Sequence, residues 1–248
     1  MTDNNKVALV TGAANGIGRA VALKLSGDGF AIAIADLEDA SAIVEEIKSN
    51  GGRASSVLCD CADPDAIADF CKSIDEVYGG TDVLVHSAGI YPRQAFSDIS
   101  HDDWHRVMNV NLNSLFYLAK GCVPSMKNKG WGRIIALASN TFYLGIPELS
   151  HYQSSKGGVI GFIRGLSAEL GEDGITCNSV APTLTRTKGT LETSPHKPEF
   201  FEFIAQMQAI KRTGLPEDVT GTVAFLASDA SAFMTGQTLT VDGGFAKL

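Results

Sequence analysis

Two side chains in the second half of the chain have the spacing of a proton-transfer pair. Tyr152 and Lys156 are four residues apart in the run YQSSK, so a helix would place them on one face. A free phenol has a pKa of about 10, and a neighbouring ammonium lowers it by stabilising phenolate. Such a tyrosine can act as a general acid or base. The common alternative is that the two side chains lie on a solvated helix face. The elements around the pair distinguish between these two interpretations.

A glycine-rich turn near the N-terminus has the composition of an anion site. The run TGAANGIG, Thr11 to Gly18, follows an apolar strand and precedes a helical pattern. Glycines let the backbone approach a pyrophosphate closely, and the N–H groups that open the helix point at it. A tight turn that binds nothing is the alternative. The strand-turn-helix context favours a dinucleotide.

Asp36 follows the second apolar run, Ala31–Ala35. A carboxylate at this place accepts hydrogen bonds from the adenine ribose hydroxyls and repels a 2′-phosphate. No Arg or Lys occurs in the next three residues (LED), and Asn15 brings no positive charge to the turn. These residues favour NAD over NADP. The alternative for Asp36 is a helix N-cap.

Short β-rich runs alternate with longer amphipathic runs, and continuously apolar strands are typical of a parallel sheet covered on both faces. We predict an α/β fold: a single Rossmann-like doubly wound parallel sheet with helices on both faces, in one dinucleotide-binding catalytic domain over residues 1–248. A long Phe-containing stretch at about 183–213 breaks the alternation and is predicted to be a substrate lid. The predicted strands are Val7–Thr11, Ala31–Ala35, Ala54–Cys59, Val83–His86, Arg133–Ala138, Ile175–Val180 and Thr238–Val241. The predicted helices are Arg19–Leu25, Asp39–Asn50, Pro64–Tyr78, a long helix capped by Ser100 and Asp103 that runs to about Lys127, Tyr152–Leu170 and Pro216–Ser228.

Charge and composition argue against several classes of protein. The chain has 248 residues, a formal net charge of −8 and no run of Lys or Arg, so nucleic acid and membranes are not expected as partners. It shows no apolar stretch of about 18 residues and no signal peptide, so a cytoplasmic location is expected. Five cysteines without a CxxC indicate reduced thiols. His101 and His105 are four residues apart, but they fit a charged first helical turn, and no metal is expected.

A series of further residues occurs in order along the chain: Thr11-Gly12, Gly16, Gly18, Asp60, Ala88-Gly89, Asn111, Ser139, Tyr152, Lys156, Asn178, Pro182 and Val241–Gly244. With them the whole chain resembles the short-chain dehydrogenase/reductase family. The resemblance implies that Tyr152 exchanges a proton with the substrate oxygen and that Lys156 tunes it and holds the nicotinamide ribose. It also implies that Ser139 binds the substrate oxygen and that Asn111 holds a water in a relay through Lys156.

The resemblance further implies an NAD site in which Asp60 contacts adenine and Gly89 lies against the cofactor. Two positions depart from the family pattern. His86-Ser87 replaces its Asn-Asn, with His86 interpreted as a structural substitute, and Thr183 replaces its Gly after Pro182. The predicted cofactor contacts are Gly12, Asn15, Gly16, Ile17, Gly18, Asp36, Leu37, Asp60, Cys61, Ser87, Ala88, Gly89, Tyr152, Lys156, Pro182, Thr183, Thr185 and Thr187.

Apolar and aromatic residues near the expected reaction centre suit a hydrophobic or aromatic alcohol or ketone. The predicted pocket residues are Tyr91, Asn140, Phe142, Tyr143, Ile146 and Phe200. The run GIYP from Gly89 is similar to bacterial 1-phenylethanol dehydrogenases, and ASNTF from Ala138 is similar to pyridoxal 4-dehydrogenase. We expect a secondary or ring-bearing alcohol as the substrate, and the resemblance implies a homotetramer. The alternatives are a 3-oxoacyl-thioester reductase, against which Asp36 and the acidic charge speak, and a non-catalytic NAD-sensing regulator.

Overall fold

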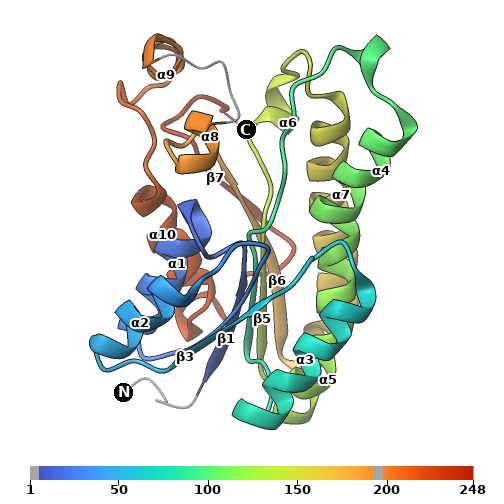
Figure 1. The fold of residues 1–248 in the computed structure, drawn as a ribbon, viewed down its shortest axis with the longest axis vertical. Coiled ribbons are helices and arrows are strands. Elements are labelled where there is room, and N and C mark those ends of the chain that lie inside the picture. Colours follow the sequence, from blue (N-terminus) through green and yellow to red (C-terminus); the bar gives the residue numbers. More distant parts are fainter. Residues whose placement is uncertain (1–5, 193–197, 248) are drawn as a thin grey trace.

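Seven parallel strands form one sheet in the order β3-β2-β1-β4-β5-β6-β7 (Figure 1). The computed structural model describes residues 6–192 and 198–247. Apart from β3 and β7 the strands are almost entirely buried, because helices cover both faces of the sheet. The predicted fold class is therefore confirmed. The strands are β1 Val7–Thr11, β2 Ala31–Asp36, β3 Ala54–Leu58, β4 Val83–His86, β5 Gly132–Leu137, β6 Ile175–Pro182 and β7 Thr238–Val241.

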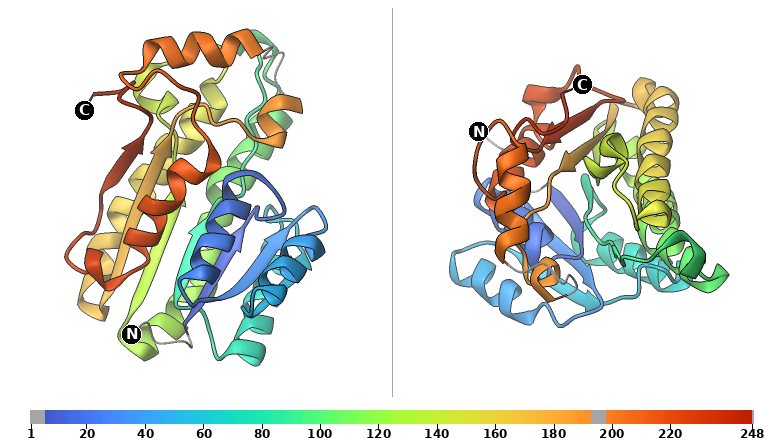
Figure 2. Two further views of the ribbon diagram at one scale, coloured as in Figure 1. Left: turned by 90° about the vertical axis from the view of Figure 1, so that its left-hand side faces the viewer. Right: turned by 90° about the horizontal axis from the view of Figure 1, so that it is seen from above.

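The helices form one layer on each face of this sheet (Figure 1). One layer holds α1 Gly16–Gly27, α2 Ser41–Ser49 and α10 Pro216–Leu226. The other holds α3 Pro64–Tyr78, α4 His101–Met108, α5 Ser114–Lys129 and α7 Ser150–Leu170. Three further helices, α6 Thr141–Leu144, α8 Lys188–Glu192 and α9 Pro198–Met207, lie beyond the carboxyl ends of the strands (Figure 2).

Element boundaries follow local chemistry where that chemistry is strong. Helix α3 has the predicted bounds because Pro64 opens it and the Asp63 side chain caps it. Helix α1 begins at Gly16, three residues before the predicted Arg19, so the last part of the glycine turn is already helical. Strand β3 ends at Leu58, one residue before the predicted end at Cys59, so Cys59 and Cys61 both lie outside it. Both are buried in the loop after β3, and all five cysteines are free thiols.

The predicted long helix after Ser100 is interrupted. Its N-terminal capping box is confirmed, with Asp103 N donating to Ser100 Oγ at 3.0 Å. After α4, however, residues Asn109–Asn113 form a π-helical turn before α5 begins. The wider turn directs Asn111 inward, where it is fully buried. A helical period alone gives no sign of such a turn.

The predicted lid stretch contains α8 and α9, which lie across the carboxyl edge of the sheet (Figure 2). Phe201 anchors α9 with 1% of its surface exposed, whereas Phe203 is 58% exposed. One phenylalanine of this stretch is thus packed inside the fold, whereas another lies on its surface. No helix in the described ranges has the length and apolar character needed to cross a membrane.

Candidate active site

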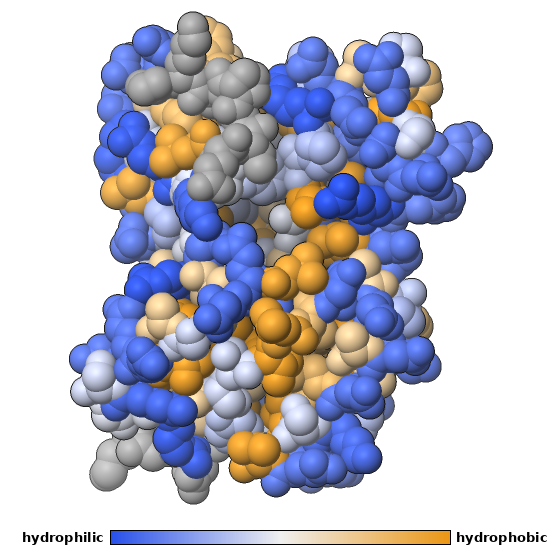
Figure 3. All heavy atoms as spheres, viewed as in Figure 1, coloured by the Kyte–Doolittle hydropathy of each residue, from blue (hydrophilic) through white to orange (hydrophobic). Residues whose placement is uncertain are grey.

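The site lies where the strand order reverses between β1 and β4, at the carboxyl ends of the strands. In doubly wound sheets this is where ligands bind, because successive connections diverge to opposite faces and leave a crevice. The glycine turn leaves β1 on one side of this crevice, and α7 brings Tyr152 and Lys156 to the other. In the view of Figure 1, apolar residues gather along the middle of the molecule, with hydrophilic residues on both sides (Figure 3).

The glycine turn is shaped by backbone contacts that leave no room for side chains. Gly12 has a φ of +66°, and a Cβ added to it would lie 2.8 Å from Ala88 Cα. A Cβ on Gly18 would lie 2.1 Å from Gly12 O. Thr11 Oγ1 accepts hydrogen bonds from the N–H groups of Ser87 and Ala88, both at 3.1 Å. These contacts join the ends of β1 and β4 into one rigid floor.

The opening of α1 fits a bound pyrophosphate. Its N-cap, Asn15, makes no side-chain cap, and no acidic residue occupies the first turn. The first N–H groups of this helix therefore keep their capacity to bind an anion at its positive end. The glycines beside it admit backbone-to-phosphate approach, so the residues present at this turn fit a dinucleotide.

Asp36 fastens the end of β2 to this turn. Its Oδ2 accepts from Ala14 N at 2.8 Å, and its Oδ1 accepts from Glu38 N at 2.9 Å. Helix α2 begins only at Ser41, so Asp36 is not its N-cap. The carboxylate keeps lone pairs for ribose hydroxyls. Leu37 beside it is 68% exposed and offers apolar surface.

Asp60 and Cys61 follow β3, the next strand along this edge. The Asp60 side chain is exposed and accepts a hydrogen bond from Ala62 N at 2.9 Å, which shapes the turn. Cys61 is 5% exposed, and the hydrogen bond with Cys59, together with burial, raises the pKa of its thiol. The contact of Asp60 with adenine stays a prediction.

The side chains of Tyr152 and Ser139, both predicted to contact the substrate oxygen, are hydrogen-bonded to each other. Ser139 lies just beyond β5, and its Oγ also accepts from Thr141 N at 3.2 Å. Burial raises the pKa of Tyr152 to about 12, and a hydrogen bond with the Ser139 side chain opposes that rise. The expectation of a lowered pKa for the Tyr152 phenol was therefore wrong. The physical reason is that desolvation of the phenol outweighs the stabilisation that neighbouring groups provide.

Lys156 lies one turn along α7 from Tyr152, with its Nζ 5.7 Å from the centre of the Tyr152 ring. Its Nζ donates to Leu137 O at 2.7 Å. Burial lowers the pKa of Lys156 to about 8. A Cβ added to Gly89 would lie 3.5 Å from Lys156 Nζ and 3.4 Å from Asn111 Oδ1. The ammonium therefore faces the floor of the crevice with two N–H donors beyond the one used by Leu137.

Asn111 clamps the loop after β4 to α7. Its Oδ1 accepts from Ile90 N at 2.8 Å, and its Nδ2 donates to Ile90 O at 2.9 Å and to Ser155 Oγ at 3.0 Å. The π-helical turn supplies the inward direction that these bonds need. Its amide is thus a positioning group for Gly89 and Ile90, and a water relay through Lys156 stays a prediction.

The departures from the family pattern have local explanations. His86 Nε2 lies 2.7 Å from Ser114 Oγ, and burial lowers the pKa of His86 to about 3, so the ring is neutral and structural. Outside glycine, the described residues adopt positive φ only at Glu148, so Thr183 needs no unusual backbone.

The residues after β6 separate into two groups. Thr183 and Thr185 are buried, and they line a cavity with Gln208 and Val241 at the base of the predicted lid. The Thr185 hydroxyl donates to Thr183 O at 3.0 Å. Thr187 is different: its methyl group would lie 3.4 Å from a Cβ on Gly16. Of the three threonines, Thr187 is therefore placed against the dinucleotide turn.

The predicted substrate residues only partly converge. Tyr91 packs edge-on against Tyr152, with ring centres 6.3 Å apart. Phe142 lies against Gly157 of α7 and is 44% exposed. Tyr143 of α6 packs partly against the core, and Ile146, just after this helix, is half-buried. Phe200 pairs with Phe203 on α9.

Asn140, one of the predicted pocket residues, is buried beside Ser139. Its side chain is 2% exposed, and its Nδ2 donates to Asp242 Oδ2 at 3.3 Å. This bond ties the end of β5 to the segment after β7, so Asn140 has a structural contact that the sequence did not indicate, and its place in the pocket stays a prediction.

Two polar links were not visible in the sequence. Lys188 of α8 forms an ion pair with Glu38 at 3.5 Å. Gln94 contacts His151 at 3.1 Å and Asp103 at 3.2 Å, which ties the start of α7 to α4.

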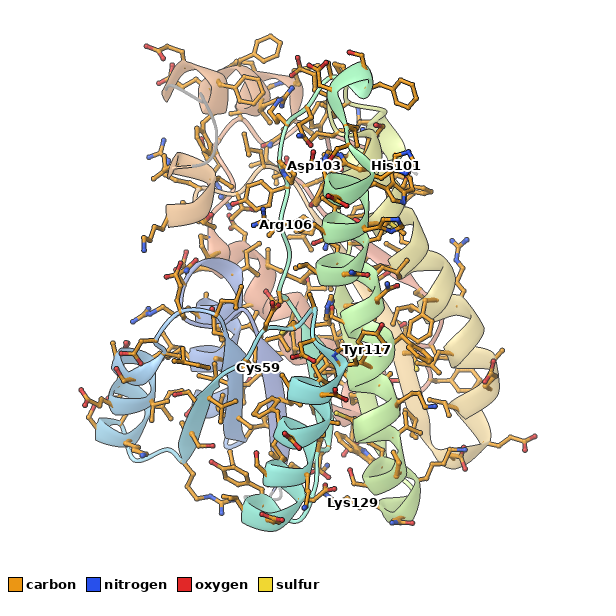
Figure 4. The ribbon with its side chains drawn as sticks, turned by 45° about the vertical axis from the view of Figure 1, so that its right-hand side comes forward. Cys59, His101, Asp103, Arg106, Tyr117 and Lys129 are labelled. Atoms are coloured by element: carbon orange, nitrogen blue, oxygen red, sulfur yellow. The ribbon has the colours of Figure 1, made fainter. Side chains whose placement is uncertain are left out.

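Figure 4 shows His101, Asp103 and Arg106 along α4, with Cys59 well apart. The described part of the chain contains no metal-binding group of three or more His, Cys, Asp or Glu residues.

Comparisons with known proteins agree with this architecture. The family model described as "Enoyl-(Acyl carrier protein) reductase" matches residues 12–246. A 3-oxoacyl-[acyl-carrier-protein] reductase from Synechocystis sp. is 37% identical over 243 residues, 96% of each chain. The (2S)-[(R)-hydroxy(phenyl)methyl]succinyl-CoA dehydrogenase subunit BbsD of Thauera aromatica is 36% identical over 242 residues, 97% of this chain and 96% of that one. A crystal structure provisionally assigned as a gluconate dehydrogenase from Agrobacterium tumefaciens superposes with a TM-score of 0.93 at 31% identity, covering 98% of this chain and 96% of that chain. The chain belongs to the short-chain dehydrogenase/reductase family and is an oxidoreductase.

Proposed function

We propose that this oxidoreductase interconverts a secondary alcohol and its ketone with NAD as the hydride carrier. The observation that carries the proposal is the grouping of Tyr152, Ser139 and Lys156 across the crevice from an uncapped, glycine-rich helix start. A bound nicotinamide supplies the hydride chemistry, and the chain supplies orientation and proton transfer.

The proton chemistry follows from the local environments. In the reductive direction the Tyr152 O–H donates to the developing alkoxide, and the Ser139 hydroxyl donates a second hydrogen bond that fixes the substrate oxygen. Burial keeps Tyr152 protonated at neutral pH, which suits an acid. In the oxidative direction the phenol must first lose its proton, so the Lys156 ammonium has to stabilise phenolate.

NAD is favoured by the acidic corner at the end of β2. The Asp36 carboxylate faces the glycine turn and Glu38 lies close by. Two carboxylates oppose the charge of a 2′-phosphate and accept bonds from ribose hydroxyls.

For the substrate, the relatives favour a 3-oxoacyl thioester, because the Synechocystis protein and its staphylococcal counterparts are named as reductases of that class. A ring-bearing secondary alcohol is the second candidate. The contact of Tyr91 with Tyr152 and the exposed Phe142 support it. The Thauera protein's name combines both features, a phenyl carbinol and a CoA thioester.

We also propose that the protein acts as a cytoplasmic homotetramer. Phe116 of α5 is 44% exposed and lies 6.3 Å from Phe162 of α7, so these two helices present aromatic surface for a second copy. Sedimentation velocity of the full chain would test this. A monomer at micromolar concentration would contradict it.

The function is tested with a matched panel of acetoacetyl-CoA and acetophenone, each with NADH and NADPH, followed by dinucleotide absorbance. Faster turnover of the thioester supports the first candidate, and preference for the aryl ketone supports the second. Tyr152→Phe should reduce turnover by about 10²- to 10⁴-fold while dinucleotide binding is retained.

Tyr117→Phe on α5 is the matched control, because it removes the same atom away from the crevice. A Tyr152→Phe protein as active as this control would disprove the mechanism. Binding of dinucleotide without turnover of any carbonyl would instead favour the sensing regulator.

A further inference from the structure

Gln94, in the loop after β4, is hydrogen-bonded to three separate segments. Its backbone N–H donates to Glu148 O at 2.9 Å, just before α7. Its side-chain Nε2 donates to Asp103 Oδ2 of α4 at 3.2 Å, and its Oε1 lies 3.1 Å from His151 Nε2 of α7. The amide oxygen can only accept, so the fully buried His151 ring donates from Nε2. One residue therefore joins the loop to α4, to α7 and to the segment before α7.

The backbone that receives the Gln94 N–H has a strained conformation. Glu148 has a φ of +64°, the one positive value outside glycine among the described residues. Such a conformation persists where the surrounding contacts over-determine it. The contacts here are the bond from Gln94 N and an ion pair between Arg93 Nε and Glu148 Oε2 at 3.3 Å. The loop after β4 is thus fixed to the start of the helix that carries the predicted proton donor.

Tyr91 lies on this loop between two points of attachment. Asn111 holds the residue just before it by two backbone hydrogen bonds of 2.8 and 2.9 Å, and Gln94 holds the loop three residues beyond it. The Tyr91 ring packs edge-on against Tyr152, with ring centres 6.3 Å apart. Its hydroxyl reaches α8, because a Cβ added to Gly189 would lie 2.6 Å from Tyr91 Oη. The ring therefore reaches from α7 to the predicted lid.

We propose that Gln94 is a positioning residue: it holds the Tyr91 ring beside Tyr152 and thereby sets the affinity of the site for an apolar group next to the substrate carbonyl. The inference rests on the proposed function, because it takes Tyr152 as the group that faces the substrate oxygen. An aromatic ring held at that place forms an apolar wall for such a group. Gln94 acts through the loop and takes no part in proton transfer.

Gln94→Leu separates this role from a general effect on the fold. It removes both side-chain bonds and keeps the backbone N–H, so the loop loses its attachment to α4 and α7 while the His151 N–H is left without its partner. Gln94→Met, which keeps the chain length, is the second variant should the first not fold. Gln237→Leu is the matched control. Its side chain is exposed just before β7, at the opposite edge of the sheet, and donates one backbone hydrogen bond of 3.0 Å.

The test uses the full chain labelled with fluorotyrosine and fluorine NMR. Gln94→Leu should move the resonances of Tyr91 and Tyr152, assigned by Tyr→Phe variants, and leave that of Tyr117 on α5 in place. Acetophenone is then titrated in the presence of oxidised NAD, which has no hydride to give to a ketone. Its Kd should rise on the order of tenfold in Gln94→Leu, the value of about one lost hydrogen bond. The Kd of 5′-AMP should be unchanged, and Gln237→Leu should match the parent in every measurement.

Unchanged tyrosine resonances or an unchanged acetophenone Kd in Gln94→Leu would overturn the proposal. An equal rise in the Kd of 5′-AMP would also overturn it, because the whole site would then be disturbed. Failure of the parent protein to bind acetophenone would overturn this inference and leave reduction of a thioester standing. If the parent binds acetophenone and the variant binds it weakly, but no carbonyl compound is turned over, only the proposed reaction is contradicted.

Discussion

The two sides of the crevice are built in different ways. On the dinucleotide side, backbone meets backbone, and added Cβ atoms on Gly12 and Gly18 would lie 2.8 Å and 2.1 Å from neighbouring main-chain atoms. On the catalytic side, buried polar side chains are held by main-chain oxygens, as Lys156 is by Leu137. The first side therefore depends mainly on close backbone packing, whereas the second depends on which protons its side chains carry.

Adding one carbon to the dinucleotide side should have the largest effect. Gly18→Ala places a Cβ against Gly12 O, and we expect a loss of about 3 kcal/mol of unfolding free energy together with loss of NAD binding. Gly27→Ala, in the same helix, meets no atom within 4 Å and should be neutral or stabilising. Urea unfolding and calorimetry of both variants measure the difference. Equal stability of the two would show that the turn is not close-packed.

Removing one charge on the catalytic side should instead reduce turnover without a loss of stability. Burial lowers the pKa of Lys156 to about 8, so keeping this group charged at neutral pH costs stability. Lys156→Met should lose about 10²- to 10⁴-fold in kcat/KM. Its Tm should rise by about 2–4 °C. Calorimetric scans beside rate assays check both, and a marked fall in Tm would contradict the account.

The same group predicts the pH dependence of carbonyl reduction. Tyr152, with its pKa raised to about 12, stays protonated, whereas Lys156 loses its charge as pH rises through about 8. Reductive kcat/KM should be level below that point and decline above it. Lys156→Arg should move the decline to higher pH, because a guanidinium keeps its proton. An unchanged profile in this variant would assign the decline to another group.

Stability should change in the opposite direction over that range. The unfolded lysine holds its proton up to its usual pKa of 10.5, so between about 8 and 10.5 the unfolded state binds more protons than the folded state. The contribution of Lys156 to unfolding free energy therefore rises with pH through this window. Comparing the parent protein with Lys156→Met at several pH values isolates that contribution.

The smallest effect is expected at His86, which is fully buried at the carboxyl end of β4. The neutral ring bonds Ser114 through Nε2, and its buried Nδ1 has no hydrogen-bond partner in the described structure. His86→Asn keeps a polar contact and removes that unpartnered atom, so unfolding free energy should change by less than about 1 kcal/mol. Turnover should stay within about threefold. A large loss of turnover alone would give His86 a role in proton transfer.

The sequence predicted those parts that depend on local signals. The bounds of β1, β4, β7 and α3 were correct because apolar runs and a capped proline mark them. Tyr152, Ser139 and Lys156 came together because strand ends and one helical turn fix their separation. The π-helical turn escaped prediction because its wider turn leaves no periodic trace.

Contacts between distant segments account for the remaining differences. Nothing near Asn140 in the chain indicates its bond to Asp242, and nothing near Glu38 indicates Lys188. The pKa of Tyr152 could not be predicted without knowing how deeply its side chain is buried. The spacing from a lysine indicates only the effect of that one charge, and not the net shift of the pKa. Such features are properties of the packed molecule.

The widened turn at Asn109–Asn113 has a consequence for tolerance to deletion. One residue more or less in a helix rotates everything beyond it by about 100°. Leu115, Leu118 and Cys122 face the sheet with at most 1% exposure only because α5 leaves the turn in its present phase. Deleting Val110 would rotate these three away from the interior and withdraw the Asn111 amide from Ile90. The packing of α5 against the sheet and the position of the loop after β4 would then be lost together, so this part of the helix cannot be shortened without losing both.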